Sequence, residues 1–191
     1  MAEAASRSGG GSRVTPNLRH VGVYVWDIER MTRFYTRAFG LEVTDRGRGN
    51  AFPHDLVFLS SEPGEHHQLV LVSGRPPDAE FSTVMQLSFK VDTLAELRGA
   101  AAHATAEGAT DLFGLNHGNA WSVYCNDPEG NTVEVYTDTP WYVPQPFGHP
   151  LDLEKSDEVI YADTEAECRA TPGYLPRAEW MAGRATARAR S

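Results

Sequence analysis

The feature that most constrains this chain is a strand–helix–strand–strand–strand pattern that occurs twice. In the first copy, residues 18–26 alternate between polar and apolar, and apolar residues then recur at helical spacing from Ile28 to Ala38. Three short strands complete this copy, at 41–44, 56–60 and 68–73. The second copy has a strand at 84–91, a helix capped by Asp92, and strands at 110–115, 121–125 and 132–137. Two copies of one unit predict two similar modules.

We therefore predict an α+β fold in which paired β-α-β-β-β modules form an open curved mixed sheet around a pocket. The modules are expected at about 16–76 and 83–140, within one domain over 16–140. Residues 1–15 are small and polar and predict a disordered lead-in. Residues 141–191 are expected to form a C-terminal extension with one short helix, over 157–170, and a frayed basic end.

Charge and composition narrow the function classes. Seventeen Lys and Arg against 26 Asp and Glu give a net charge of −9, which argues against nucleic-acid binding. The C-terminal residues 170–191 carry four arginines and one glutamate; we expect a solvated tail there rather than a nucleic-acid or membrane contact. No apolar run approaches the ~18 residues of a membrane span. Two cysteines make no disulfide framework, so a cytoplasmic location is expected.

Two side chains could carry metal chemistry. His20 alternates with the apolar positions of the first strand, and Glu134 lies between Val133 and Val135 in the last. Both therefore point away from the face that packs on a helix. If the two strands border one hollow, an imidazole and a carboxylate face it together, as in sites for Fe, Mn, Zn or Ni. The alternative is an exposed histidine and glutamate on a solvated sheet face.

Three motifs make the chain resemble the vicinal oxygen chelate superfamily, which includes glyoxalase I, fosfomycin and bleomycin resistance proteins and extradiol dioxygenases. They are LRHVGVYV at 18–25, FYTRAFGL at 34–41 and DPEGNTVEVY at 127–136. Two further segments, HHQLVLV at 66–72 and NHGNAWSVY at 116–124, are similar to the small single-module type I extradiol dioxygenases that act on biphenyl-2,3-diol-like compounds.

That resemblance implies a function and roles for individual residues. It implies an enzyme that cleaves a catechol-type aromatic ring with dioxygen, with Fe(II) as the cofactor and Mn(II) or another divalent metal as the alternative. His20 and Glu134 would be metal ligands. His67 would act as acid and base, and His117 and Tyr124 would orient the substrate. The aromatic segment after Pro140 suggests a surface covered by another subunit, so a homo-oligomer is expected.

One position departs from the family pattern. Where the dioxygenases place a third ligand, a histidine at the start of the second module, this chain has Gln86. A glutamine carbonyl is a neutral oxygen donor that suits Fe(II) less well than imidazole does. Three outcomes are possible: an active dioxygenase with an altered ligand set, a different metal with different chemistry, or a fold that has lost the metal. His66 or His67 could also replace the missing imidazole.

The superfamily also includes isomerases and proteins that bind a metal or a small molecule without oxidation. The isomerases use a carboxylate from the last strand of the first module, and residues 68–72 contain neither Asp nor Glu. Isomerase chemistry is therefore disfavoured. A non-oxidative metalloprotein or a small-molecule-binding module of resistance type stays as the alternative to the dioxygenase, and the two differ in whether dioxygen is consumed.

Overall fold

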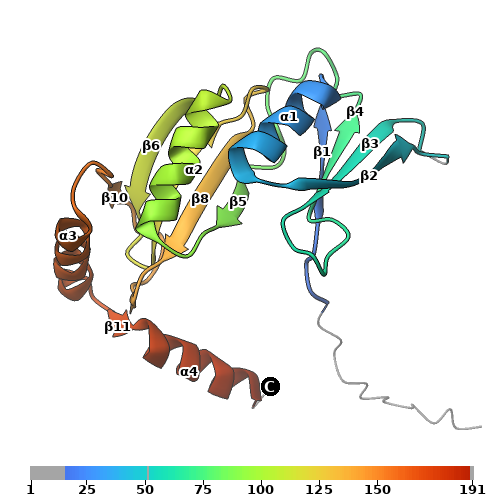
Figure 1. Ribbon diagram of the computed structural model, residues 1–191. Helices are drawn as coiled ribbons and strands as arrows, with labels where there is room; N and C mark the ends of the chain where they lie inside the picture. Colours follow the sequence, from blue (N-terminus) through green and yellow to red (C-terminus); the bar gives the residue numbers. More distant parts are fainter. Residues whose placement is uncertain (1–15, 51, 190–191) are drawn as a thin grey trace, which may run out of the picture.

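The computed structural model describes residues 16–50 and 52–189 (Figure 1). The expected lead-in over 1–15 lies outside the described residues. The first module comprises β1 (Val21–Val25), α1 (Ile28–Phe39), β2 (Glu42–Arg48), β3 (Asp55–Ser60) and β4 (Leu69–Ser73). Its sheet has the order β1-β4-β3-β2, in which β1 and β4 run parallel and the other neighbours antiparallel.

The second module repeats this topology. It comprises β5 (Leu87–Lys90), α2 (Leu94–Ala106), β6 (Thr110–Asn116), β7 (Ala120–Asn126) and β8 (Thr132–Asp138). Its sheet has the order β5-β8-β7-β6, again with the first and last strands parallel, and β10 (His149–Pro150) extends it beyond β6. The predicted α+β fold of open mixed sheets is confirmed, and each module keeps its own sheet.

Local sequence explains where the two helices begin and end. The Asp27 side chain accepts the Arg30 N–H at 2.9 Å and caps α1, which ends at Gly40 in the left-handed region (φ 68°) that glycine adopts at little cost. The expected cap at Asp92 is wrong by one residue. Thr93 caps α2, because its side chain and that of Glu96 satisfy each other's backbone N–H groups in a capping box.

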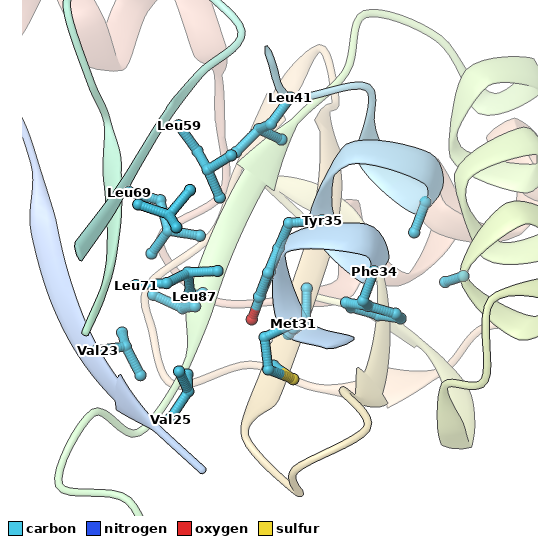
Figure 2. Close-up of a cluster of buried hydrophobic side chains, with 14 of the residues drawn as sticks. Val23, Val25, Met31, Phe34, Tyr35, Leu41, Leu59, Leu69, Leu71 and Leu87 are labelled. Atoms are coloured by element: carbon cyan, nitrogen blue, oxygen red, sulfur yellow. The ribbon is translucent and has the colours of Figure 1, made fainter. Parts of the chain in front are cut away.

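The two modules share a core on the helix side of their sheets. Figure 2 shows Met31 and Tyr35 of α1 packed against the valines and leucines of β1 and β4, with Leu87 of β5 in the same cluster. Val133 of β8 also belongs to it and is fully buried. Burial of each such side chain contributes roughly 1.5–3 kcal/mol. The opposite faces of both sheets are thereby left for His20 and Glu134.

The turn between β7 and β8 also joins the modules. Glu129 accepts the backbone N–H groups of Trp26 and Asp27 at 2.7–2.9 Å, and its carboxylate lies 3.8 Å from the Arg75 guanidinium. The Tyr35 hydroxyl donates to Asp127 at 2.9 Å. Asp127, Glu129 and Tyr35 are buried, so the turn is more than a hairpin connection. We call Asp127 and Glu129 the hairpin latch.

The extension beyond residue 140 contains β9 (Trp141–Tyr142), α3 (Asp157–Ala170), β11 (Leu175–Pro176) and α4 (Arg177–Ala189). The helix α3 coincides with the one expected from the sequence and buries Ile160, Thr164 and Cys168. Where a frayed end was expected, the structure has α4, because β11 pairs with β9 and orders the chain before the helix begins. Within the described residues, no helix has the length and apolar character needed to cross a lipid bilayer.

Candidate functional site

The Glu134 carboxylate lies at the centre of a set of hydrogen bonds on the helix-free face of the second sheet. Strand register places Ser88 of β5 and Tyr124 of β7 on either side of it. One carboxylate oxygen accepts from the hydroxyls of Ser122 (2.8 Å) and Tyr124 (2.7 Å). The other accepts from the Ser88 hydroxyl and the Gln86 amide, both at 2.6 Å. The buried Glu134 carboxylate thus accepts hydrogen bonds from four uncharged donor groups.

The Tyr124 phenol is held in its protonated form. Burial raises the pKa of Tyr124 well above its ordinary value, and the hydrogen bond to Glu134 and the negative charge of that carboxylate raise it further. The hydroxyl is therefore a hydrogen-bond donor throughout the neutral range.

His117 extends this set of contacts from β7 toward the C-terminal extension. Its Nδ1 lies 2.9 Å from the Phe147 carbonyl oxygen, which can only accept, so Nδ1 carries a hydrogen. Its Nε2 lies 3.0 Å from the Tyr124 hydroxyl and 3.9 Å from Glu134. The single phenol hydrogen can go to Glu134 or to His117. The three side chains therefore form a chain along which a proton can be exchanged.

The first sheet carries a histidine cluster on the corresponding face. His20, just before β1, and His67, just before β4, have ring centroids 4.3 Å apart. The His66 and His67 Nδ1 atoms lie 2.8 Å apart, and Phe58 of β3 contacts both of these rings. Burial lowers the pKa of His67, and the nearby His20 and His66 lower it further. His67 is therefore neutral near pH 7 and can accept a proton.

The structure brings the predicted site residues together in two groups rather than one. Gln86, Tyr124, His117 and Glu134 form the group on the second sheet, and His20 and His67 form the group on the first. His20, Gln86 and Ser88 all line a groove of about 1110 Å³ between the modules. Among the described residues, no three His, Cys, Asp or Glu side chains lie close enough to hold a metal ion.

Sequence reasoning missed Ser88 and Ser122. Each is a small hydroxyl residue between large apolar neighbours in a strand, Leu87 and Phe89 for the first and Trp121 and Val123 for the second. That pattern signals a polar contact on the face opposite the core. The orientation of Gln86 is also new: its amide nitrogen faces Glu134, so in this structure it acts as a donor.

The acid that an isomerase would need is absent from β4, whose residues are Leu, Val, Leu, Val and Ser. The nearest upstream glutamate, Glu65, pairs with Arg19 at 2.7 Å near the surface. The described part of the chain therefore offers no carboxylate from this strand for proton abstraction at carbon.

Comparison with known proteins gives consistent results. Residues 17–135 match the Glyoxalase/Bleomycin resistance protein/Dioxygenase superfamily. Biphenyl-2,3-diol 1,2-dioxygenase 2 of Rhodococcus globerulus is 26% identical over 128 residues, 65% of this chain and 64% of that protein. Biphenyl-2,3-diol 1,2-dioxygenase 3 of the same organism is 28% identical over 170 residues, 86% and 80% of the two chains. The chain thus spans less than two thirds of the first of these relatives.

The fold is also found in solved structures. The fosfomycin resistance protein FosX of Listeria monocytogenes, crystallised with Mn(II) and sulfate, superimposes with a TM-score of 0.52 at 16% identity. The match covers 66% of this chain and 95% of FosX. At this identity the likeness concerns the fold alone.

Proposed function

Because the chain belongs to the glyoxalase/bleomycin resistance protein/dioxygenase superfamily, we propose that it is a metal-dependent extradiol dioxygenase that cleaves a catechol-type aromatic ring. The observation that carries the proposal is the hydrogen-bonded chain Glu134–Tyr124–His117 on one sheet face. It connects a carboxylate, which can bind a metal ion, to a phenol that donates a hydrogen bond and to an imidazole that can exchange a proton. The relatives named for biphenyl-2,3-diol oxygenation support the same substrate class, an aromatic diol with dioxygen.

The donor types suit a hard or borderline divalent ion. Glu134 and Gln86 would hold it from the second module, and His20 from the facing wall of the groove. Rotation of the Gln86 amide exchanges its nitrogen for its oxygen beside Glu134 without moving the backbone. When bound, Fe(II) or Mn(II) supplies electron transfer between the catechol and dioxygen. His20 must approach the other two donors for the set to be complete.

The remaining side chains would act on the substrate. Tyr124 stays protonated and donates to a diol oxygen, which orients the ring. His117 Nε2 accepts or returns a proton through Tyr124, while the neutral His67, which packs against His20 on the first sheet, takes the proton of the second hydroxyl. Either His66 or His67 can instead serve as an imidazole ligand, and then His117 is the remaining acid–base group.

The chain is further proposed to function as a homo-oligomer. Large apolar side chains near the donor residues are exposed, among them Leu18, Phe81 and Met85 at 92%, 75% and 73%. They lie within five residues of His20 or Gln86 in sequence. Another copy that covers them would also exclude water from the groove.

The decisive experiment is oxygen uptake by anaerobically purified, Fe(II)-loaded protein with a panel of catechols. The proposal expects one dioxygen consumed per ring-opened product, and no uptake by the His20→Ala variant. His149→Ala is the matched control, since His149 lies on β10 and pairs with Glu167. A protein that holds one metal ion per chain and consumes no oxygen would contradict the dioxygenase.

A second candidate is a non-oxidative metalloprotein or a small-molecule-binding module of the same fold. Two observations favour it: Gln86 stands where the dioxygenases have an imidazole, and no three His, Cys, Asp or Glu side chains of the described residues are placed to hold a metal ion. Absence of both bound metal and oxygen uptake in the same experiment would support the binding module.

A further inference from the structure

The helix α4 projects away from both modules (Figure 1), yet its base is firmly held. Arg177 donates to the Asn119 carbonyl at 3.2 Å and pairs with Asp138 at 2.9 Å. The Trp180 indole stacks on Tyr142, with centroids 4.7 Å apart and planes 14° apart. A helix anchored in this way points in a defined direction, unlike a solvated tail.

The turn before α4 has a backbone conformation that requires glycine. Gly173 has φ 86°, and a Cβ there would lie 2.8 Å from the Pro144 side chain. The following residues pair as β11 with β9, so both the conformation and the direction of the chain are set before α4 begins.

Beyond its first turn, α4 presents a basic and apolar ridge. Met181, Arg184 and Arg188 follow one another at spacings of three and four, which places them on one face. Residues 181–188 are all exposed, Met181 at 56%. The helix carries three arginines and one glutamate. We call Met181, Arg184 and Arg188 the α4 ridge.

The helix α3 presents the complementary ridge. Glu158, Tyr161 and Glu165 have the same spacings of three and four, and Glu158 and Tyr161 are exposed, Tyr161 at 43%. The Tyr161 ring packs on Trp121, and Glu165 also pairs with Arg169 of the same helix at 2.7 Å. The helix carries five acidic residues and one arginine. Both ridges span eight residues, and their seven steps of 1.5 Å give a length of about 10 Å. We call Glu158, Tyr161 and Glu165 the α3 ridge.

We propose that α4 of one copy docks on α3 of a second copy, and the reverse, in a two-fold symmetric dimer. Opposite charges of the two ridges set the pairing, and Met181 and Tyr161 supply apolar contact between them. Reciprocal use of the same two helices is what an isologous interface requires. A nucleic acid or an anionic membrane is the weaker partner, because the chain as a whole carries a net charge of −9.

The proposal is tested by sedimentation of the full chain and of charge-reversed variants. Arg184→Glu with Arg188→Glu should raise the dimer dissociation constant by at least about tenfold, since attraction becomes repulsion at two positions. Glu158→Arg with Glu165→Arg should do the same. Arg33→Glu on the exposed side of α1 is the matched control and should leave the dimer unchanged. Circular dichroism and the thermal midpoint verify that each variant is folded.

Charge exchange supplies the stringent arm of the test. When the two double variants are mixed, both α4–α3 contacts of the mixed dimer regain opposite charges, so association should return. The chain with all four reversals should likewise form a homodimer. A wild-type monomer, reversal without effect on association, or failure of the exchange to restore it would each overturn the proposal. Vesicles containing phosphatidylserine test the membrane alternative. If the wild type binds them, and the Arg184→Glu, Arg188→Glu variant loses this binding but still dimerises, the proposal is also overturned.

Discussion

The two modules have the same strand order but very different candidate surfaces. On the second sheet, Glu134 is buried and accepts hydrogen bonds from four side chains, so the group is ordered before any ligand arrives. On the first sheet, His20 is exposed and contacts His67 through ring packing. Repetition of a backbone therefore did not duplicate a site. It provided two faces, one preorganised around a carboxylate and one that offers imidazoles.

The largest expected effect is loss of the carboxylate. Glu134→Ala removes the charged ligand and the shared acceptor of four hydrogen bonds, so Mn(II) affinity should fall by more than about 100-fold, the upper range for loss of an outer partner alone. Mn(II) titration followed by electron paramagnetic resonance measures this. Glu42→Ala, on the exposed strand β2, is the control. Unchanged Mn(II) affinity in the Glu134 variant would remove this residue from the proposed ligand set.

A mixing experiment asks whether the two surfaces meet within one chain or between two. His20→Ala and Glu134→Ala chains should each bind no metal, whereas co-expression should recover binding if the facing walls come from different copies. Random dimers would then regain about a quarter of the sites, since half are mixed and each has one intact pair. We expect no recovery, because His20 and Gln86 line one groove of the same chain. Recovery would place the two walls in different copies.

The hairpin latch tests whether the modules depend on each other. Glu129→Ala leaves the partly buried N–H groups of Trp26 and Asp27 without their acceptor. It also removes the carboxylate beside Arg75, whose guanidinium keeps its bonds to the carbonyl of residue 129 and to Asn131. Removal of the Glu129 carboxylate should lower the free energy of unfolding by about 3 kcal/mol. Urea denaturation followed by tryptophan fluorescence reports it. A loss below about 1 kcal/mol would show that water replaces the carboxylate and that the latch contributes little.

Substitution of Gln86 tests whether the side chain at position 86 binds the metal ion. Gln86→His should strengthen divalent metal binding by about tenfold, because imidazole is the better donor for a borderline metal ion. Gln86→Asn, which keeps the amide but shortens its reach, is the matched variant and should weaken binding. Equal affinities in the two variants and the wild type would mean that position 86 serves Glu134 as a hydrogen-bond donor and does not bind the metal.

Sequence reasoning found the modules because apolar periodicity reports which face of each element is buried. Strand alternation also placed Glu134 on the face away from the helices, whereas Tyr124 was assigned from the family resemblance. Sequence reasoning could not find the contact between Gln86 and Glu134, or place His20 in a separate group, since side-chain partners depend on strand register and on how the sheets are spaced. The helix α4 was also missed, because an Ala- and Arg-rich end looks frayed until its anchor at Tyr142 and Asp138 is known.

The smallest expected effect concerns Tyr35, the contact of the first module with the hairpin latch. Burial raises the pKa of Tyr35 well above its ordinary value, and Asp127 raises it further. Below about pH 10 the phenol is protonated in both the folded and the unfolded chain. Above that pH the unfolded chain ionises first, so stability falls as the pH rises.

Tyr35→Phe should therefore cost about 1 kcal/mol at pH 7, the contribution of one buried hydrogen bond, and should flatten the alkaline loss of stability. Tyr24→Phe, on the exposed face of β1, is the matched control. Urea midpoints at pH 7 and pH 10.5 measure both effects. An alkaline slope that is the same in the Tyr35 variant and the wild type would show that another group titrates on unfolding. The contact between the modules would then be carried by Glu129 rather than by the phenol.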